Sequence, residues 1–219
     1  LTNESLKTIE LDMIQLLPLS KPVQTTKDYK AYLIRTLLNR LFKMRMNAWA
    51  FENPSYKKAS IQYSSFLNAT GVLLCSVELL PGKMEKGISE FIAQQEQIFR
   101  YGFTRAEIER AKKVIYNNLE NKLQNQQNPT SIELMNDVYA DFYVGNRFTS
   151  LQEEYQLVQL YFPEIDSVAL ARNLAKVYSP RKMHYLLRAN EKADKEVGGD
   201  MTLMAIIKEA RKQSLERYN

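Results

Sequence analysis

The segment around Gly102 constrains the fold of this chain more than any other, because it specifies where one helix ends and the next begins. Gly102 is placed to take the left-handed conformation that ends a helix. Thr104 and Glu107 have the spacing of a capping box, and Phe103 and Ile108 flank them as a hydrophobic staple does. These signals predict a corner between two helices. The corner is a structural device and contains no catalytic group.

Four stretches have the pattern of β-strands. Three alternate apolar and polar side chains, as half-buried strands do, and one is apolar at most positions, as expected in the middle of a sheet. The expected strands run from Ile9 to near Pro18, from Lys58 to Ser65, from Val72 to Leu79 and from Met183 to Arg188. A hairpin loop is expected between the middle two, at Asn68–Gly71.

Stretches with apolar residues at helical spacing separate these strands. The expected helices run from a capping box at Thr25 and Asp28 to about Trp49, from Lys83 to Gly102, and through most of Thr104 to Tyr178. Within the last range, Asn128–Pro129 opens a helix, Gly145 ends it, and Ser150 with Glu153 forms a capping box. The order predicts an α+β fold: a ferredoxin-like split β-α-β core with an antiparallel-rich sheet and additional helices.

The polar stretch from Asn190 to Asp200 is interpreted as a linker. A final amphipathic helix follows it and is expected to end in Arg217-Tyr218-Asn219. We therefore expect a single α+β domain at residues 1–190. Residues 191–219 are expected to be a linker and a C-terminal helix that lead toward a further domain.

The chain has very few residues that could perform hydrolytic or metal chemistry. Among 219 residues it has one histidine, His184, and one cysteine, Cys75. A zinc site with two histidines is therefore excluded, and so is an internal disulfide. His184 is interpreted as a strand residue and Cys75 as a buried thiol, since no histidine near it in sequence could activate it. We expect no catalytic residue and no metal ligands in this chain.

Charge and hydropathy argue against two further classes of partner. The formal net charge is +5, but the basic residues occur in pairs among acidic ones rather than in clusters, which argues against a nucleic-acid partner. No apolar run approaches the roughly 20 residues that span a bilayer. The chain begins with Leu1 and no signal segment follows, as expected for a piece of a longer protein. A single cysteine fits either a bacterial periplasm or a bacterial cytoplasm.

Several segments together carry a family resemblance. They are Leu38–Phe42, Pro81–Gly82, Arg100–Lys113 and Phe162–Val168, in this order. The chain resembles the pitrilysin/insulinase family of zinc peptidases, which includes mitochondrial processing peptidase, over about residues 6–190. The corner is similar to the family's segment at Gly102, Phe103, Thr104, Glu107, Ile108, Ala111 and Lys112.

The resemblance implies an architecture and a role. Family members contain tandem copies of one α+β domain, of which the first carries the zinc motif H-x-x-E-H. This chain lacks that motif, so it is most similar to the non-catalytic second repeat of a large bacterial member. The resemblance implies that zinc lies in another domain of the parent protein. The implied partners are the other repeats of the same polypeptide and the peptide substrate. No substrate-binding residue is assigned, because the spacing of Arg45 and Tyr56 does not match the family.

Two alternatives remain. The first is a structural homologue without peptidase activity, similar to the core subunits of respiratory complexes, and an H-x-x-E-H motif encoded upstream would argue against it. The second is an unrelated basic helical binding module, which salt-dependent binding to nucleic acid would favour.

Overall fold

The structure is a computed structural model that describes residues 4–19, 21–52, 54–66, 70–124, 131–147, 149–213 and 215–218. The expected helix start at Asn128–Pro129 lies outside these residues, as do the first two positions of the expected hairpin loop at Asn68–Gly71.

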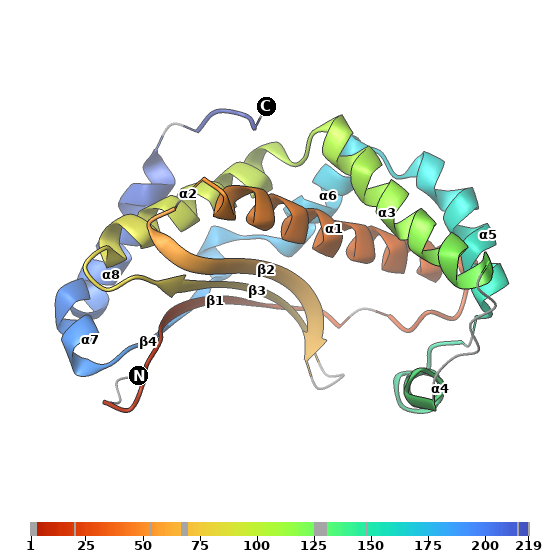
Figure 1. Cartoon of the computed structure of the whole chain (residues 1–219), viewed down its shortest axis with the longest axis horizontal. Coiled ribbons are helices and arrows are strands. Elements are labelled where there is room, and N and C mark those ends of the chain that lie inside the picture. The colour runs from red at the N-terminus through yellow and green to blue at the C-terminus, as the bar shows by residue number, and fades with distance from the viewer. Residues whose placement is uncertain are drawn as a thin grey trace.

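A four-stranded antiparallel sheet lies beneath a layer of helices, as Figure 1 shows. The strands are β1 (Ile9–Leu17), β2 (Tyr56–Phe66), β3 (Thr70–Leu79) and β4 (His184–Arg188). The helices are α1 (Thr26–Ala50), α2 (Met84–Tyr101), α3 (Arg105–Gln124), α4 (Ser131–Tyr139), α5 (Leu151–Tyr161), α6 (Ser167–Val177), α7 (Glu191–Val197) and α8 (Gly199–Lys212). A π-helical turn (Ala140–Val144) follows α4, and short 3-10 turns span Phe162–Glu164 and Pro180–Lys182. The predicted α+β class is confirmed.

The strand order β2-β3-β1-β4 places β3 and β1 inside the sheet, as the apolar pattern of Val72–Leu79 predicts. Both neighbours of β1 pair with it antiparallel, so Met13 stands opposite Cys75 on one side and opposite Tyr185 on the other. Because β3 also pairs antiparallel with β2, strands β1 and β2 run in the same direction on either side of β3.

The two faces of the sheet differ. Residues of one face, such as Leu11 and Val77, are completely buried beneath the helix layer, while Ile14 and Leu74 on the other face are half-buried. Gln15 lies on the same face as Leu11 and Met13 and is buried with them. Its side-chain oxygen accepts a hydrogen bond from Ser179 N at 2.7 Å, which satisfies the buried group.

The caps predicted from the sequence form as expected. Thr25 with Asp28 and Ser150 with Glu153 both make reciprocal capping boxes, at the starts of α1 and α5. Hydrogen bonds from Thr25 hold the pKa of Asp28 below its usual range.

Asn39 of α1 attaches this helix to the free edge of the sheet. Its amide donates to Tyr63 O at 2.7 Å and accepts from Tyr63 N at 2.8 Å. The side chain therefore pairs with the edge of β2 as a neighbouring strand would, which protects that edge at Tyr63.

The polar stretch at residues 190–200, interpreted as a linker, is largely helical. Residues Glu191–Val197 form α7, whose Ala193 and Val197 are buried, and Asn190 accepts a hydrogen bond from Ala193 N at 2.9 Å. The polar composition of this stretch gave no sign of a short helix, because only two of its side chains, Ala193 and Val197, are buried. The division of the chain at residue 190, with a further domain beyond it, stays a prediction.

The final helix ends earlier than the sequence pattern indicates. Helix α8 stops at Lys212, and the chain beyond it returns along α2, where Tyr101 Oη donates to Leu215 O and Gln97 Nε2 donates to Glu216 O. The predicted buried face of α8 is confirmed, and it contains Leu203, Ile207 and Ala210.

We expect α8 to be part of the cooperative fold. Ile207 is 1% exposed, so Ile207→Ala should lower the free energy of unfolding by about 2–5 kcal/mol through lost burial and a cavity. Met201→Ala on the same helix, where the side chain is 89% exposed, should change it by less than about 0.5 kcal/mol. Urea unfolding of both variants measures this, and equal effects would show that α8 does not contribute to the core.

Candidate functional site

The predicted corner at Gly102 forms, with one difference in backbone geometry. Gly102 N donates to Ile98 O at 2.8 Å and ends α2. Its φ of 70° is positive as expected, but its ψ of −145° lies outside the left-handed helical region. This conformation is open essentially to glycine alone, so the requirement for glycine is stricter than the sequence pattern implies.

The capping box of the corner is also confirmed. Glu107 Oε2 accepts from Thr104 N at 2.8 Å, and Thr104 Oγ1 accepts from Glu107 N at 3.2 Å. Phe103 and Ile108, the expected staple, are both buried.

The structure adds a partner that the sequence analysis missed. Arg45 of α1 is 1% exposed and binds Glu107 through both sides of its guanidinium, with Nε donating to Oε1 at 2.6 Å. The available signal was its position, because Arg45 has the helical spacing of the buried residues Leu41 and Trp49. Burial alone would raise the pKa of Glu107, but hydrogen bonds from Arg45 and Thr104 bring it below its usual range.

Aromatic rings surround the guanidinium of Arg45. Tyr218 of the C-terminal tail stacks on it at 3.8 Å from the ring centroid, and Phe103 and Trp49 lie at 5.3 Å and 5.5 Å. The corner thus joins α1, α3 and the tail through one cation. Arg45, Glu107 and Thr104 bond to one another rather than to an open site. The corner therefore stays interpreted as structural.

The other candidate residues of the sequence analysis do not come together. His184 and Cys75 project from opposite faces of the sheet, since Cys75 shares a rung with Met13 and Tyr185, the neighbour of His184. Cys75 is fully buried, and burial raises the pKa of its thiol, which disfavours a nucleophilic thiolate. Among the described residues, no group of three His, Cys, Asp or Glu side chains could hold a metal ion. None of the helices described is long and apolar enough to cross a membrane.

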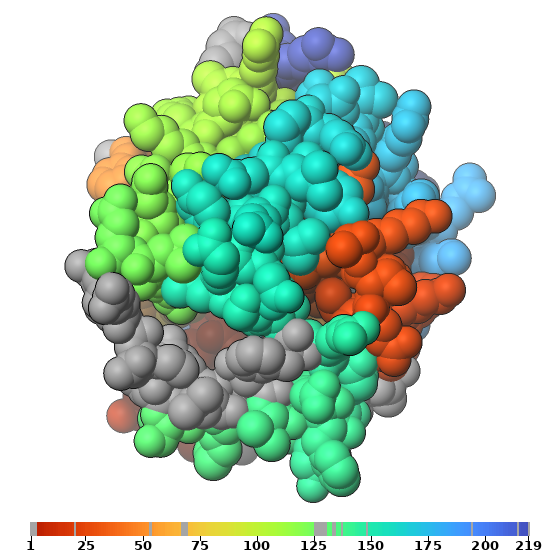
Figure 2. Space-filling view, turned by 90° about the vertical axis from the view of Figure 1, so that its right-hand side faces the viewer, coloured from red at the N-terminus to blue at the C-terminus, as the bar shows by residue number. Residues whose placement is uncertain are grey.

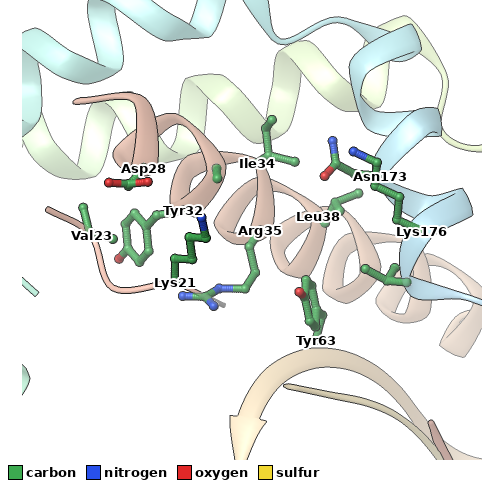
Figure 3. Close-up of a pocket in the computed structure, with 12 residues that line it drawn as sticks. Lys21, Val23, Asp28, Tyr32, Ile34, Arg35, Leu38, Tyr63, Asn173 and Lys176 are labelled. Carbon is green, nitrogen blue, oxygen red and sulfur yellow. The ribbon is translucent and has the colours of Figure 1, made fainter. Parts of the chain in front are cut away.

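A pocket of about 280 Å³ lies between α1, the end of α6 and the edge strand β2. Figure 3 shows the side chains that line it, among them the cations Lys21, Arg35 and Lys176 and the rings of Tyr32 and Tyr63. The sequence alone does not indicate this pocket, because its cations come from segments far apart in the chain.

Helix α4 and the π-helical turn after it carry an apolar surface that faces outward. Six large side chains of this segment are 52–78% exposed, and we call them the α4 face: Ile132, Met135, Val138, Tyr139, Phe142 and Tyr143. Figure 2 shows the segment, in green, along the lower rim of the molecule beneath α3 and α5. Exposed apolar side chains gathered in one segment are typical of a protein–protein contact.

Comparison with known proteins gives structural relatives only. No protein-family model and no curated protein matches the sequence. The whole chain superposes on 24% of the periplasmic protease PqqL from Escherichia coli, with a TM-score of 0.88 and 16% identity. It covers 47% of the structure of the first half of that protease, with the same TM-score.

Two other relatives extend the comparison. An insulinase family protease from Yersinia pestis matches 96% of this chain over 45% of its own, with a TM-score of 0.75 and 12% identity. A chain of complex III2 from Candida albicans matches 94% over 48% of its own, with a TM-score of 0.61 and 11% identity. The chain has the fold of insulinase-like proteases. It spans between a quarter and a half of these relatives, and the resemblance inferred from the corner is confirmed at the level of the fold.

We expect Gly102→Ala to be destabilising through its backbone alone. A Cβ at Gly102 would meet only Leu174 Cδ1, at 3.9 Å, so crowding is excluded and the strained φ and ψ remain. The loss should be about 1–3 kcal/mol, at least as large as the loss of about 1 kcal/mol expected for the capping variant Thr104→Ala. Urea unfolding measures both, and a Gly102→Ala variant as stable as the parent chain would contradict the strain.

We expect Arg45→Leu to lower the free energy of unfolding by about 3–5 kcal/mol at neutral pH, because it leaves the Glu107 carboxylate buried without its partner. Arg45 helps to hold the pKa of Glu107 low in the folded state. The ionised Glu107 therefore stabilises the fold fully above its unfolded-state pKa of about 4.3, and this stabilisation is lost as the pH falls through its lower folded-state pKa. The difference between the two proteins should therefore shrink below about pH 4. Lys43→Leu, an exposed change on the same helix, is the control. A difference that does not vary with pH would contradict this role of Glu107.

Proposed function

We propose that this chain is a non-catalytic repeat domain of an insulinase-type zinc peptidase of bacteria. In this proposal it packs against the zinc-bearing domain and forms part of the wall of the peptide-degrading chamber. The observation that carries the proposal is the match of the entire chain to a quarter of PqqL, a protease, at a TM-score of 0.88. A domain that is a fraction of a protease can serve the activity without containing the reacting groups.

Two further observations support a position for the chain within the parent protein. The chain matches about half of the first half of PqqL, so the repeat it corresponds to belongs to that half. The zinc motif of the family lies in the first repeat, and this sequence has no H-x-x-E-H segment. We therefore assign the chain to the second repeat of an N-terminal half. In the neighbouring repeat, zinc would activate the attacking water and a glutamate would serve as the base.

Two surfaces have the properties that this role needs. The α4 face exposes apolar side chains that a neighbouring domain of the same polypeptide would cover, since the relatives continue well beyond the span of this chain. The sheet carries α1 and α2 on one side, and its other side is open in Figure 1 among the described residues. We propose that this open side faces the chamber. We also assign the sheet to the split β-α-β plan of ferredoxin-like folds, which its strand order supports.

A scaffold without peptidase activity is the second candidate. The match to a chain of complex III2 from Candida albicans favours it, because that chain belongs to a complex not described as a protease. The two candidates differ in what the intact parent protein does, not in the fold of this chain.

We expect the isolated 219-residue chain to bind no stoichiometric zinc and to hydrolyse no peptide, and the intact parent to hydrolyse a quenched fluorescent peptide until a chelator removes its metal. Metal analysis after dialysis and the peptide assay on both proteins measure this. Chelator-sensitive turnover by the isolated chain would overturn the proposal. An intact parent protein without peptidase activity would instead favour the second candidate, a scaffold.

A substitution in the α4 face tests the packing role within the same assay. Phe142 is 78% exposed, so Phe142→Asp should leave the stability of the isolated chain unchanged but lower the peptidase activity of the parent, where the charge would enter an interface. Phe51→Asp, at a side chain that is 88% exposed at the end of α1, is the matched control. Equal effects of the two substitutions on the parent would contradict an interface at α4.

A further inference from the structure

Three cations from three segments border the pocket of Figure 3. Lys21 precedes α1, Arg35 lies within α1, and Lys176 lies near the end of α6. In the figure, Lys21 and Arg35 extend side by side next to Tyr32, and Lys176 lies across the pocket beyond Leu38. The fold therefore gathers positive charge around one hollow, although the sequence shows no basic cluster.

These cations have no anionic side chain bonded to them. Within the described part of the chain, none of the three makes a salt bridge or hydrogen bond, and the guanidinium of Arg35 lies over the ring of Tyr32, 5.7 Å from its centroid. Some other surface lysines are paired inside the domain, as Lys57 is with Glu78 at 2.6 Å. The cations at the pocket are thus available for a ligand.

Among the described residues that line the pocket, the carboxylate is that of Asp28, which is already engaged and whose pKa Lys21 also helps to lower. Asp28 Oδ2 accepts hydrogen bonds from Thr25 N at 3.0 Å and from Thr25 Oγ1 at 2.7 Å, as part of the cap of α1. It offsets one of the three positive charges, and a net positive charge remains. This cap also occupies the N-terminus of α1, where a phosphate would otherwise find backbone N–H groups.

The remaining walls suit a short aliphatic stem with a planar charged end. Ile34, Leu38 and Val177 supply apolar contacts, and Tyr63 is held in place because Asn39 bonds its backbone on both sides. A volume of about 280 Å³ admits one or two side chains rather than a large cofactor. The Arg35 guanidinium can bind a carboxylate through two parallel hydrogen bonds.

We propose that this pocket binds the carboxylate side chain of an acidic peptide segment. The methylene groups of a glutamate would contact the apolar wall, and its carboxylate would lie between Arg35 and Lys21, with Lys176 contributing at longer range. The net charge of +5 would assist the approach of such a segment. The proposal concerns this chain alone and holds whether the parent is a peptidase or a scaffold.

The test measures binding of labelled peptides to the 219-residue chain by fluorescence anisotropy. The probes are a glutamate peptide with blocked ends, its glutamine counterpart of the same length, and inorganic phosphate as a competitor. We expect the glutamate peptide to bind at low salt, more weakly as salt is added, and the glutamine peptide not to bind. Phosphate should compete only weakly.

Matched variants locate the binding site. Arg35→Gln should weaken binding of the glutamate peptide by roughly tenfold, and Lys21→Gln and the exposed Lys176→Gln by about threefold each. Lys27→Gln removes the same charge from an exposed position of α1 outside the pocket, and should change binding by less than about twofold. Lys176→Gln lies on the surface of α6 and keeps the test valid if Arg35→Gln fails to fold.

Three results would overturn the proposal. Equal losses for Lys27→Gln and the pocket variants would mean that binding depends only on overall charge. Equal binding of the glutamine peptide would exclude a carboxylate site. Tighter binding of phosphate than of the glutamate peptide would assign the pocket to a different ligand.

Discussion

The buried ion pair between Arg45 and Glu107 connects three parts of the fold that lie far apart in the sequence. Glu107 closes the capping box of α3, Arg45 lies in the buried face of α1, and Tyr218 stacks on the guanidinium from the end of the chain. A buried charge is costly unless its partners are complete, so each element is favoured only where the other two are in place. The pair therefore specifies how α1, the corner and the tail meet, and contributes less to stability than its burial suggests.

The buried carboxylate of Glu96 fixes the C-terminal helix α8 in a similar way. Arg211 of α8 donates to Glu96 of α2 at 3.1 Å, and the hydroxyl of Tyr178 donates to the same carboxylate. Burial and the nearby Glu96 carboxylate raise the pKa of Tyr178, so this hydroxyl remains a donor. Helix α8 is consequently bound by a directional contact as well as by its apolar face. This is why residues after the last strand belong to the core rather than to a flexible connection.

Local signals predicted most of the fold because each acts over a few residues. The caps at Thr25 and Ser150 and the corner at Gly102 are complete within one turn of helix, and the alternation of β1 needs only its own strand. The missed features depend on contacts made across the fold. The partner of Glu107 lies 62 positions away, and the pocket cations meet only after α1 and α6 have packed. A polar composition also concealed α7, since two buried side chains are enough to fix so short a helix.

Some charged side chains of this chain bind partners inside the domain, and others are exposed at its surface. Arg45, Arg211 and Arg188 each bind carboxylates inside the domain, so their charges are used in holding the fold together. The cations of the pocket and the exposed side chains of the α4 face are not used in this way. Groups that a fold keeps exposed without an internal partner are those available to an external one. The two proposed roles, contact with a neighbouring domain and binding of an acidic peptide, both depend on such exposed groups.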